Sequence, residues 1–285
     1  MKTKKTLKLA YSPCPNDTFI FKAIAEQLID SKGYVFDIEL EDVETLNLKA
    51  KKAIHDVSKL SFAAFGNLAD RYALLRSGSA LGMGCGPLII SLKGRAIGDR
   101  AKPAVAVPGL GTTAYHLFRF YMADLFTGLD FDILPMPFDK IMPAVQEKKA
   151  DFGVVIHEGR FVYQSMGLEL KADLGQWWEE QTSLPIPLGC IAVKRDIDQH
   201  TACDIQTLIR ASIDHAFSNP GSCRDYIEQH AQELEASVID QHISLYVNDF
   251  SKDIGKTGEK AICTFFEKAC SAGLMKAVDL PLFAC

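Results

Sequence analysis

Two features are missing from the sequence: a long apolar run and a concentration of charge of one sign. No stretch approaches the ~18 apolar residues that a helix needs to span a bilayer. The 31 lysines and arginines are offset by 36 aspartates and glutamates, which leaves a formal net charge of −5 without a basic stripe. Nucleic acids are bound by clustered positive charge. We therefore expect neither a membrane span nor nucleic-acid binding.

The amino-terminal segment also lacks the apolar core of a secretory signal. It reads MKTKKTLKLAYSPCP, and its apolar part is only LKLAY before Ser12 and Pro13. A signal peptide carries ~7–15 apolar residues at this point. We therefore expect a cytoplasmic protein.

Cysteines at metal-ligand spacing are missing as well. No pair has the CxxC spacing, and no cysteine stands beside a histidine at the spacing of a zinc site. Eight cysteines are present: Cys14, Cys85, Cys190, Cys203, Cys223, Cys263, Cys270 and Cys285. In a reducing compartment such residues are small, buried, free thiols. We expect eight free thiols and no bound metal.

Strand and helix patterns, by contrast, alternate through much of the chain. With 285 residues, 48% of them hydrophobic, the chain can form one large domain or two lobes. Repeated strand-helix units between residues 7 and 156 predict a mainly parallel sheet with right-handed crossovers. One of the expected helices covers residues 62–75. The end of the chain is helical, with four helices expected near residues 204–218, 222–231, 237–250 and 258–272.

Two apolar strands, near residues 88–91 and 190–193, bracket a complete α/β block. A lobe inserted into another lobe is the layout of a two-lobed solute-binding fold. The expected class is therefore α/β, with lobe 1 formed by residues 1–92 and 191–285 and lobe 2 by residues 93–190. Pockets favour such interfaces, so we expect a ligand cleft between the lobes and a hinge motion that closes it.

The stretch DFGVVIHEGR, residues 151–160, places a histidine at the end of an apolar strand. A buried parallel strand has this pattern when it presents a polar residue at its carboxyl end. Ligands bind at that edge of open α/β sheets. A free imidazole titrates near pH ~6.5 and can accept a proton at neutral pH. His157 is therefore a candidate catalytic base, although the residues alone leave a structural role open.

Six other histidines are present. His116 is expected one turn inside a helix. Four more belong to the carboxy-terminal helical region: His200, His215, His230 and His242. Histidines in such helices usually lie at the surface or pack in the core, so we expect no catalytic role for them.

The segment VPGLGTTAY, residues 107–115, is a glycine-rich loop between a strand and a helix. It fits a dinucleotide-binding fingerprint formally, but the acid expected ~20 residues later, at the end of the next strand, is missing there. The loop instead suits a carboxylate or another anion, held by amide groups and by Thr112 or Thr113. A threonine that only caps the helix is the alternative.

Further polar candidates follow other predicted strands. The segment SPCPNDT, residues 12–18, places Asn16, Asp17 or Cys14 at the cleft, or else forms a rigid turn with Asp17 as the helix cap. Cys14 has no histidine near it in sequence, so we do not expect it to be a nucleophile.

Residues 59–61, Lys59, Leu60 and Ser61, also end a strand just before a helix. Ser61 is expected either to cap that helix or to hydrogen-bond a ligand. Asn47 opens another helix, and a solvated surface position is its simplest interpretation.

Taken together, these segments resemble the 1,4-dihydroxy-6-naphthoate synthase family of the futalosine route to menaquinone. Nine motifs carry the resemblance, in the family's order and over nearly the whole chain: SPCPNDTFIF, LEDVETLN, KLSFAAF, RYALLRSGSALG, AVPGLGTTAY, IHEGRF, DLGQWWEE, LPIPLGCI and YVNDFS. Gly111 departs from relatives that carry a larger residue before the two threonines, which affects loop flexibility more than chemistry.

The resemblance implies a fold like type 2 periplasmic solute-binding proteins and a cytosolic lyase. Its substrate would be cyclic dehypoxanthinyl futalosine, cleaved at a carbon–carbon bond to 1,4-dihydroxy-6-naphthoate without cofactor or metal. The family's catalytic base maps onto His157. Its substrate contacts map onto these residues: Lys59, Leu60, Ser61, Thr112 and Thr113. Asn16 and Asn47 are additional candidate contacts in the cleft.

Three other functions are weighed against this one. A non-catalytic solute-binding protein predicts an export signal or a lipid-anchor cysteine near the start of the chain. The chorismate-processing sister enzyme of the same pathway is not expected to carry SPCPNDT and IHE at these places. A dinucleotide-dependent oxidoreductase requires an acid at the end of the strand after the glycine loop, where none stands.

Overall fold

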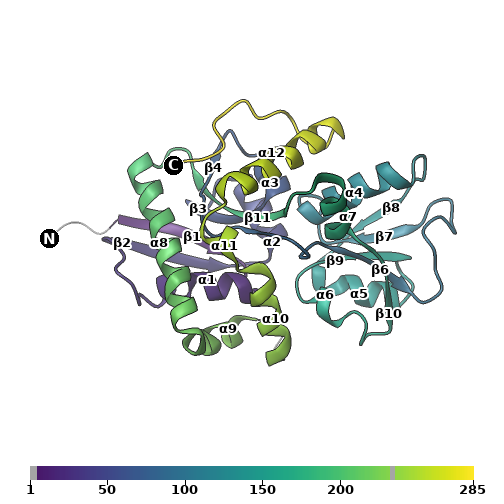
Figure 1. The fold of residues 1–285 in the computed structure, drawn as a ribbon, viewed down its shortest axis with the longest axis horizontal. Coiled ribbons are helices and arrows are strands. Elements are labelled where there is room, and N and C mark those ends of the chain that lie inside the picture. The colour runs from purple at the N-terminus through teal and green to yellow at the C-terminus, as the bar shows by residue number, and fades with distance from the viewer. Residues whose placement is uncertain (1–4, 232–234) are drawn as a thin grey trace.

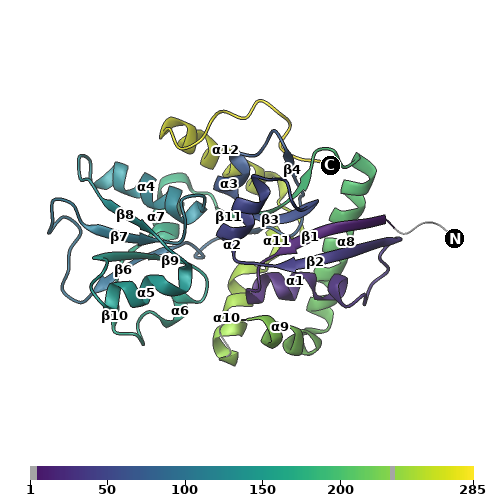
Figure 2. The same ribbon diagram turned by 180° about the vertical axis from the view of Figure 1, so that it is seen from behind.

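The computed structural model describes residues 5–231 and 235–285, which form two α/β lobes side by side (Figure 1). The view from behind shows the same division (Figure 2). Within these described residues, no helix combines the length and apolar character that a bilayer crossing requires.

The first sheet belongs to the lobe that contains the amino-terminal strand. Its six described strands are β1 (Lys5–Tyr11), β2 (Tyr34–Leu40), β3 (Val57–Ser61), β4 (Tyr72–Leu74), β5 (Ala80–Gly82) and β11 (Ile186–Lys194). Their order is β2-β1-β3-β11-β4, and β5 also pairs with β11. β1 is parallel to β2 and β3, as the strand-helix units predict, whereas β11 is antiparallel to β3.

The second sheet has the order β10-β6-β9-β7-β8. Its five described strands are β6 (Leu88–Leu92), β7 (Ala104–Val107), β8 (Asp132–Pro135), β9 (Phe152–Val155) and β10 (Leu168–Asp173). β7 is parallel to both β8 and β9. The carboxyl ends of β7 and β9 therefore lie at the same edge, which brings the glycine loop and His157 to one side of the sheet.

Helices cover the faces of both sheets (Figure 1). The first lobe begins with α1 (Pro15–Ala25), α2 (Val43–Ala50) and α3 (Phe62–Gly66). The second lobe contains α4 (Thr113–Leu125), α5 (Phe138–Gln146), α6 (Gly159–Val162) and α7 (Leu174–Thr182). After β11 the chain forms α8 (Gln199–Ser218), the 3₁₀ helix η1 (Pro220–Cys223), α9 (Arg224–His230), α10 (Ala236–Tyr246), α11 (Asp249–Lys252) and α12 (Gly255–Ser271). The four helices expected in this region correspond to α8, α9, α10 and α12.

The strand pairing shifts both expected lobe boundaries toward the amino terminus. β6 pairs with β9 and β10, so residues 88–92 belong to the second sheet rather than to lobe 1. β11 already pairs with β5 of the first sheet at Ile186, so lobe 2 ends before residue 190. An apolar strand pattern reveals burial but not the partner strand, which explains both errors.

Two elements also differ from the expected secondary structure. The helix expected over residues 62–75 ends at Gly66, and the same apolar stretch then forms β4 along β11. Strand β10 was not expected, although it pairs along β6. In both cases pairing with a strand distant in sequence decides the local structure, which is the usual limit of propensity arguments.

One apolar core extends through both lobes. It joins Phe62 and Phe65 of α3, Phe118 of α4 and Phe265 of α12, all fully buried. Burial of such a side chain contributes about 1.5–3 kcal/mol relative to leaving it exposed. This shared core holds the lobes together on the side of α3, α4 and α12.

The expectation of eight free thiols is wrong for one pair. Cys203 and Cys285 form a disulfide, with their Cα atoms 5.8 Å apart. The carboxy-terminal residues fold back beside β4, where Ala284 N donates to Leu74 O at 3.0 Å, and this brings Cys285 to α8. A return of this kind has no signature in cysteine spacing. Cys263 is a free thiol as expected, but it is exposed rather than buried.

Candidate interlobe active site

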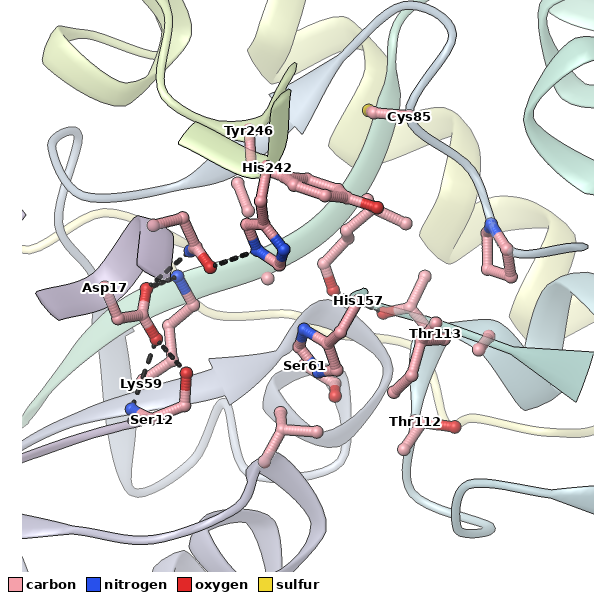
Figure 3. A pocket seen from close by; sticks show the side chains of 18 residues that line it. Ser12, Asp17, Lys59, Ser61, Cys85, Thr112, Thr113, His157, His242 and Tyr246 are labelled. Atoms are coloured by element: carbon pink, nitrogen blue, oxygen red, sulfur yellow. Dashed lines mark hydrogen bonds and ion pairs between the residues drawn. The ribbon is translucent and has the colours of Figure 1, made fainter. Parts of the chain in front are cut away.

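A pocket lies between the lobes, where strand ends and helix ends from both of them meet (Figure 3). About 640 Å³ within it is free of protein atoms, open solvent at its mouth included. The residues in its lining that can hydrogen-bond or titrate are Ser12, Asn16, Asp17, Lys59, Ser61, Cys85, Thr112, Thr113, His157, His242 and Tyr246.

On the first-lobe side, Asp17 is the centre of a buried polar network. Lys59 Nζ donates to its carboxylate at 2.6 Å, and both side chains are at most 6% exposed. Ser12 Oγ and Asn16 Nδ2 donate to the same carboxylate at 2.7 and 2.8 Å. A buried carboxylate with a cationic partner and two further donors is stable as an ion, whereas loss of the cation would leave an uncompensated charge.

Asp17 is therefore not the cap of α1. The N-cap position is Cys14, which makes no side-chain capping hydrogen bond. Pro15 supplies the fixed φ that starts the helix without one. The segment SPCPNDT forms a rigid turn, but its acid faces the pocket rather than the helix end.

Ser61 is held by Asn47. Asn47 Oδ1 accepts from Ser61 N at 3.0 Å, and Asn47 Nδ2 donates to Ser61 Oγ at 3.1 Å. The same amide donates across the cleft to Gly111 O at 3.4 Å. The expected surface position of Asn47 is therefore wrong, because Asn47 is buried behind the pocket lining and orients Ser61. Ser61 occupies the N-cap position of α3 without a side-chain capping bond.

Leu60 does not line the pocket, unlike its neighbours Lys59 and Ser61. Successive side chains of a strand point to opposite faces, and the Leu60 side chain points into the shared apolar core. Its backbone is paired with Cys190 of β11. The expected contact of Leu60 with substrate is therefore not available to its side chain.

On the second-lobe side, Thr112 and Thr113 end the glycine loop and begin α4. Thr112 Oγ1 accepts from Tyr115 N at 3.2 Å, so the capping interpretation holds for this residue. Thr113 Oγ1 donates to Leu188 O of β11 at 2.8 Å. Both threonines also line the pocket, so capping and ligand contact are compatible here.

The glycine loop contacts the first lobe through Glu44 of α2. Gly111 N donates to Glu44 Oε1 at 3.3 Å, and burial raises the pKa of this carboxyl. Gly109 has φ +130°, and a Cβ there would lie 2.4 Å from Glu44 Cδ. Glycine is therefore required at position 109 by both backbone conformation and space.

His157 follows β9 by two residues and has a left-handed backbone with φ 53°. Such a conformation costs on the order of 1–3 kcal/mol in a non-glycine residue and occurs mostly where the surrounding structure imposes it. The side chain is half-buried beside Phe138, with ring centroids 5.1 Å apart. Desolvation by burial lowers the pKa of His157 to about 4. The imidazole is therefore neutral at physiological pH and can accept a proton.

Cys14 lies next to this imidazole, with Sγ 3.4 Å from His157 Nδ1. Burial raises the pKa of the Cys14 thiol well above its ordinary value, so the group is a thiol rather than a reactive thiolate. Cys14, His157 and Glu158 each bring a ligand atom within 4.8 Å of the other two. Thiol, imidazole and carboxylate donors suit zinc, which makes a metal ion a competing occupant of this position.

His242 was missed by the sequence analysis, which assigned it to a surface or packing role. It is fully buried in α10 and lines the pocket, with its ring parallel to that of His157 at a centroid distance of 6.1 Å. A signal was present, because Val238, Ile239, His242 and Tyr246 lie on one helix face and form its buried stripe. A histidine in such a stripe is buried rather than solvated.

Comparison with known proteins agrees with this architecture. A family model described as menaquinone biosynthesis matches residues 7–271. The chain is 43% identical to a 1,4-dihydroxy-6-naphthoate synthase of Streptomyces coelicolor over 96% of both chains. It is 41% identical to one of Thermus thermophilus over 98% of this chain and 99% of the relative.

Solved structures give the same result for the fold. A protein of Archaeoglobus fulgidus has a TM-score of 0.86 and 32% identity, and the match covers 95% of this chain and 98% of that protein. The alkanesulfonate-binding protein of Xanthomonas axonopodis has a TM-score of 0.73 at 11% identity, with 97% and 96% coverage. The expected two-lobed periplasmic-binding-protein-like fold is thereby confirmed. The chain belongs to the menaquinone-biosynthesis family that includes the 1,4-dihydroxy-6-naphthoate synthases.

Proposed function

We propose that this protein is a carbon–carbon lyase that converts cyclic dehypoxanthinyl futalosine to 1,4-dihydroxy-6-naphthoate in the cytoplasm. His157 acts as the general base, and the reaction uses no organic cofactor or metal. The observation that carries the proposal is a neutral histidine in a pocket between two lobes. The names of the relatives from Streptomyces coelicolor and Thermus thermophilus support the product.

The chemistry requires a base that is neutral before the reaction. Removal of a proton from carbon next to a carbonyl group proceeds best in a water-poor site with a positioned base. For His157 Nε2 to take that proton, Nδ1 must carry the other hydrogen, and the Cys14 sulfur at 3.4 Å is then its acceptor. Formation of an aromatic product drives the cleavage, so the enzyme mainly orients and deprotonates the substrate.

The two walls of the pocket contact different parts of the substrate. The amino end of α4, with Thr112 and Thr113, is suited to the carboxylate of the substrate because helix amino ends favour negative charge. Ser61, fixed by Asn47, faces it from the first lobe. Closure of the lobes would bring the reacting carbon against His157.

The test is turnover by the purified protein, supplied with cyclic dehypoxanthinyl futalosine and nothing else, with the product followed by chromatography. We expect stoichiometric release of 1,4-dihydroxy-6-naphthoate. Binding without product would identify a solute-binding protein instead. A requirement for an added redox cofactor would overturn the reaction class.

A further inference from the structure

The second histidine of the pocket, His242, has a defined hydrogen-bonding partner on one side only. Its Nε2 lies 2.9 Å from Asn16 Oδ1. Its Nδ1 is buried and has no hydrogen-bond partner among the described residues. Glu158 Oε1 lies 3.9 Å from Nδ1, which is beyond hydrogen-bond distance, and a carboxylate cannot donate when it is ionised.

The network around Asp17 determines which nitrogen of His242 carries the hydrogen. A carboxylate only accepts hydrogen bonds, so the Asn16 group that faces Asp17 must be its NH₂, at 2.8 Å. The carbonyl oxygen of Asn16 then faces His242, and an oxygen of this kind also only accepts. His242 Nε2 must therefore be the donor. In the neutral imidazole, which burial favours, Nδ1 keeps the lone pair.

Lys59 extends this chain of bonds. Its Nζ donates to the Asp17 carboxylate at 2.6 Å in a buried ion pair, so Asp17 serves as an acceptor toward Lys59 as well as toward Asn16. Figure 3 shows Lys59, Asp17 and the His242 ring as one connected group beside His157. The hydrogen bonds therefore converge on Asp17: Lys59 donates to it from one side, and on the other side His242 donates to Asn16, which donates to Asp17.

A buried acceptor without a partner is costly unless a ligand supplies the missing hydrogen. We propose that His242 Nδ1 accepts a hydrogen bond from a hydroxyl group of the bound substrate. The inference rests on the proposed function, since the sugar-derived part of that substrate carries the hydroxyls. Because the rings of His157 and His242 are 6.1 Å apart and parallel, a substrate that His157 deprotonates lies within reach of His242. His242 is thus the residue that orients the substrate for His157.

Two substitutions of His242 separate this role from packing. The amide of glutamine lies near the position of Nε2, so His242→Gln keeps the donor toward Asn16 and loses the acceptor. The amide of asparagine lies near Nδ1, so His242→Asn keeps an acceptor and loses the contact with Asn16. We expect His242→Gln to raise KM on the order of tenfold, since a substrate hydroxyl is left unpaired. His242→Asn should stay closer to wild type. His200→Gln, at an 84% exposed side chain, is the control for the substitution itself and should leave KM unchanged.

The two variants can also give results that contradict the inference. If His242→Asn raises KM as much as His242→Gln does, or more, then His242 serves to support Asn16 and the inference is overturned. Absence of turnover by the wild-type enzyme would overturn the proposed function and this inference together, whereas wild-type turnover with His242→Gln within twofold would overturn the inference alone.

A measurement that leaves His242 unchanged keeps the inference testable if the His242 variants do not fold. ¹⁵N NMR of histidine-labelled protein reports which ring nitrogen is protonated. We expect a hydrogen on Nε2 of His242 and a bare Nδ1 whose signal shifts when cyclic dehypoxanthinyl futalosine is added to the inactive His157→Ala variant. A hydrogen on Nδ1 would contradict the assignment.

Discussion

The two walls of the pocket are built in different ways. The first-lobe wall is a network in which Asp17 takes hydrogen bonds from residues on β3, α1 and the loop before it, and nearly every polar atom is paired. The second-lobe wall presents one histidine on a left-handed backbone and two threonines after a glycine loop. The first wall is rigid through many mutual contacts, and the second depends on backbone conformations that few residues adopt.

This difference suggests that the first wall binds the substrate and the second wall carries out the chemical step. The first wall pairs most of its polar groups with one another and leaves His242 Nδ1 unpaired among the described residues, so it can hold a substrate without changing its own protonation. A wall with a neutral, desolvated imidazole can exchange a proton. Changes to the first wall should therefore alter stability and binding, whereas changes to His157 should alter the chemical step.

The largest effect is expected for His157→Ala. Loss of a positioned general base lowers kcat by about 10²–10⁴-fold. Substrate affinity should persist, because the contacts of the first-lobe wall remain, and calorimetric titration of the variant with substrate measures it. His200→Ala, at an exposed position, is the matched control and should keep wild-type turnover. Near wild-type activity of His157→Ala would remove the base assignment.

Lys59→Met tests the rigidity of the first wall. It leaves the Asp17 carboxylate buried without its cation, which destabilises a fold by about 3–5 kcal/mol. Denaturant unfolding measures the loss. Lys49→Met is the control, because Lys49 pairs with Glu39 and Glu41 on the surface at 2.7 Å and its removal should barely change the unfolding midpoint. If the two substitutions lowered the free energy of unfolding equally, the Lys59–Asp17 pair would contribute no more to stability than a surface ion pair does.

Gly109→Ala tests the glycine loop of the second wall. Alanine at φ +130° is strained and its Cβ meets Glu44, so we expect a loss of about 1–3 kcal/mol. Thermal unfolding measures this loss of stability. A rise in KM of the same variant would show that the contact between the glycine loop and Glu44 is lost as well. Gly111→Ala approaches only the movable end of Glu44, at 3.1 Å, and should cost less. The reverse order would contradict the role of Gly109.

Chelation is expected to have no effect. The Cys14–His157–Glu158 cluster can hold a metal ion, but a metal on His157 Nδ1, the nitrogen beside Cys14, would leave the ring hydrogen on Nε2, which the proposed base requires free. Activity measured before and after dialysis against a chelator should therefore agree. If dialysis abolished activity and added zinc restored it, the cluster would be identified as a catalytic metal centre instead.

The contrast between the walls also explains what could be predicted from the sequence. Ser61 ends strand β3, and His157, Thr112 and Thr113 come after strands β9 and β7. Local pattern and the rule that ligands bind at strand ends were therefore sufficient to predict that they meet. The Asp17–Lys59 pair joins residues 42 positions apart, and the contact of Asn16 with His242 spans 226 positions. No local pattern encodes such distances.

The same limit applies to the fold. The strand-helix alternation predicted two lobes and most elements, because hydrophobic periodicity is local. The assignment of β6 to the second sheet and the disulfide between Cys203 and Cys285 depend on which distant segment packs beside each element. The family motifs, and not the periodicity, led to the proposed function.

The lowered pKa of His157 affects the stability of the fold as well as catalysis. Burial places the pKa of His157 at about 4 in the folded protein, below its ordinary value of 6.5. The unfolded chain therefore binds this proton more readily than the folded one. The corresponding contribution to stability is complete above pH 6.5 and is lost as the pH falls toward 4.

Direct titration of His157 tests the central claim, that the second wall keeps this imidazole neutral so that it can act as a base. NMR of ¹³C-labelled histidine, with His157→Ala to assign the signal, follows its protonation in the folded enzyme. We predict an unchanged, neutral signal from pH 8 down to about pH 5, with protonation beginning only as the pH approaches about 4. A midpoint near the ordinary value of 6.5 would contradict the account.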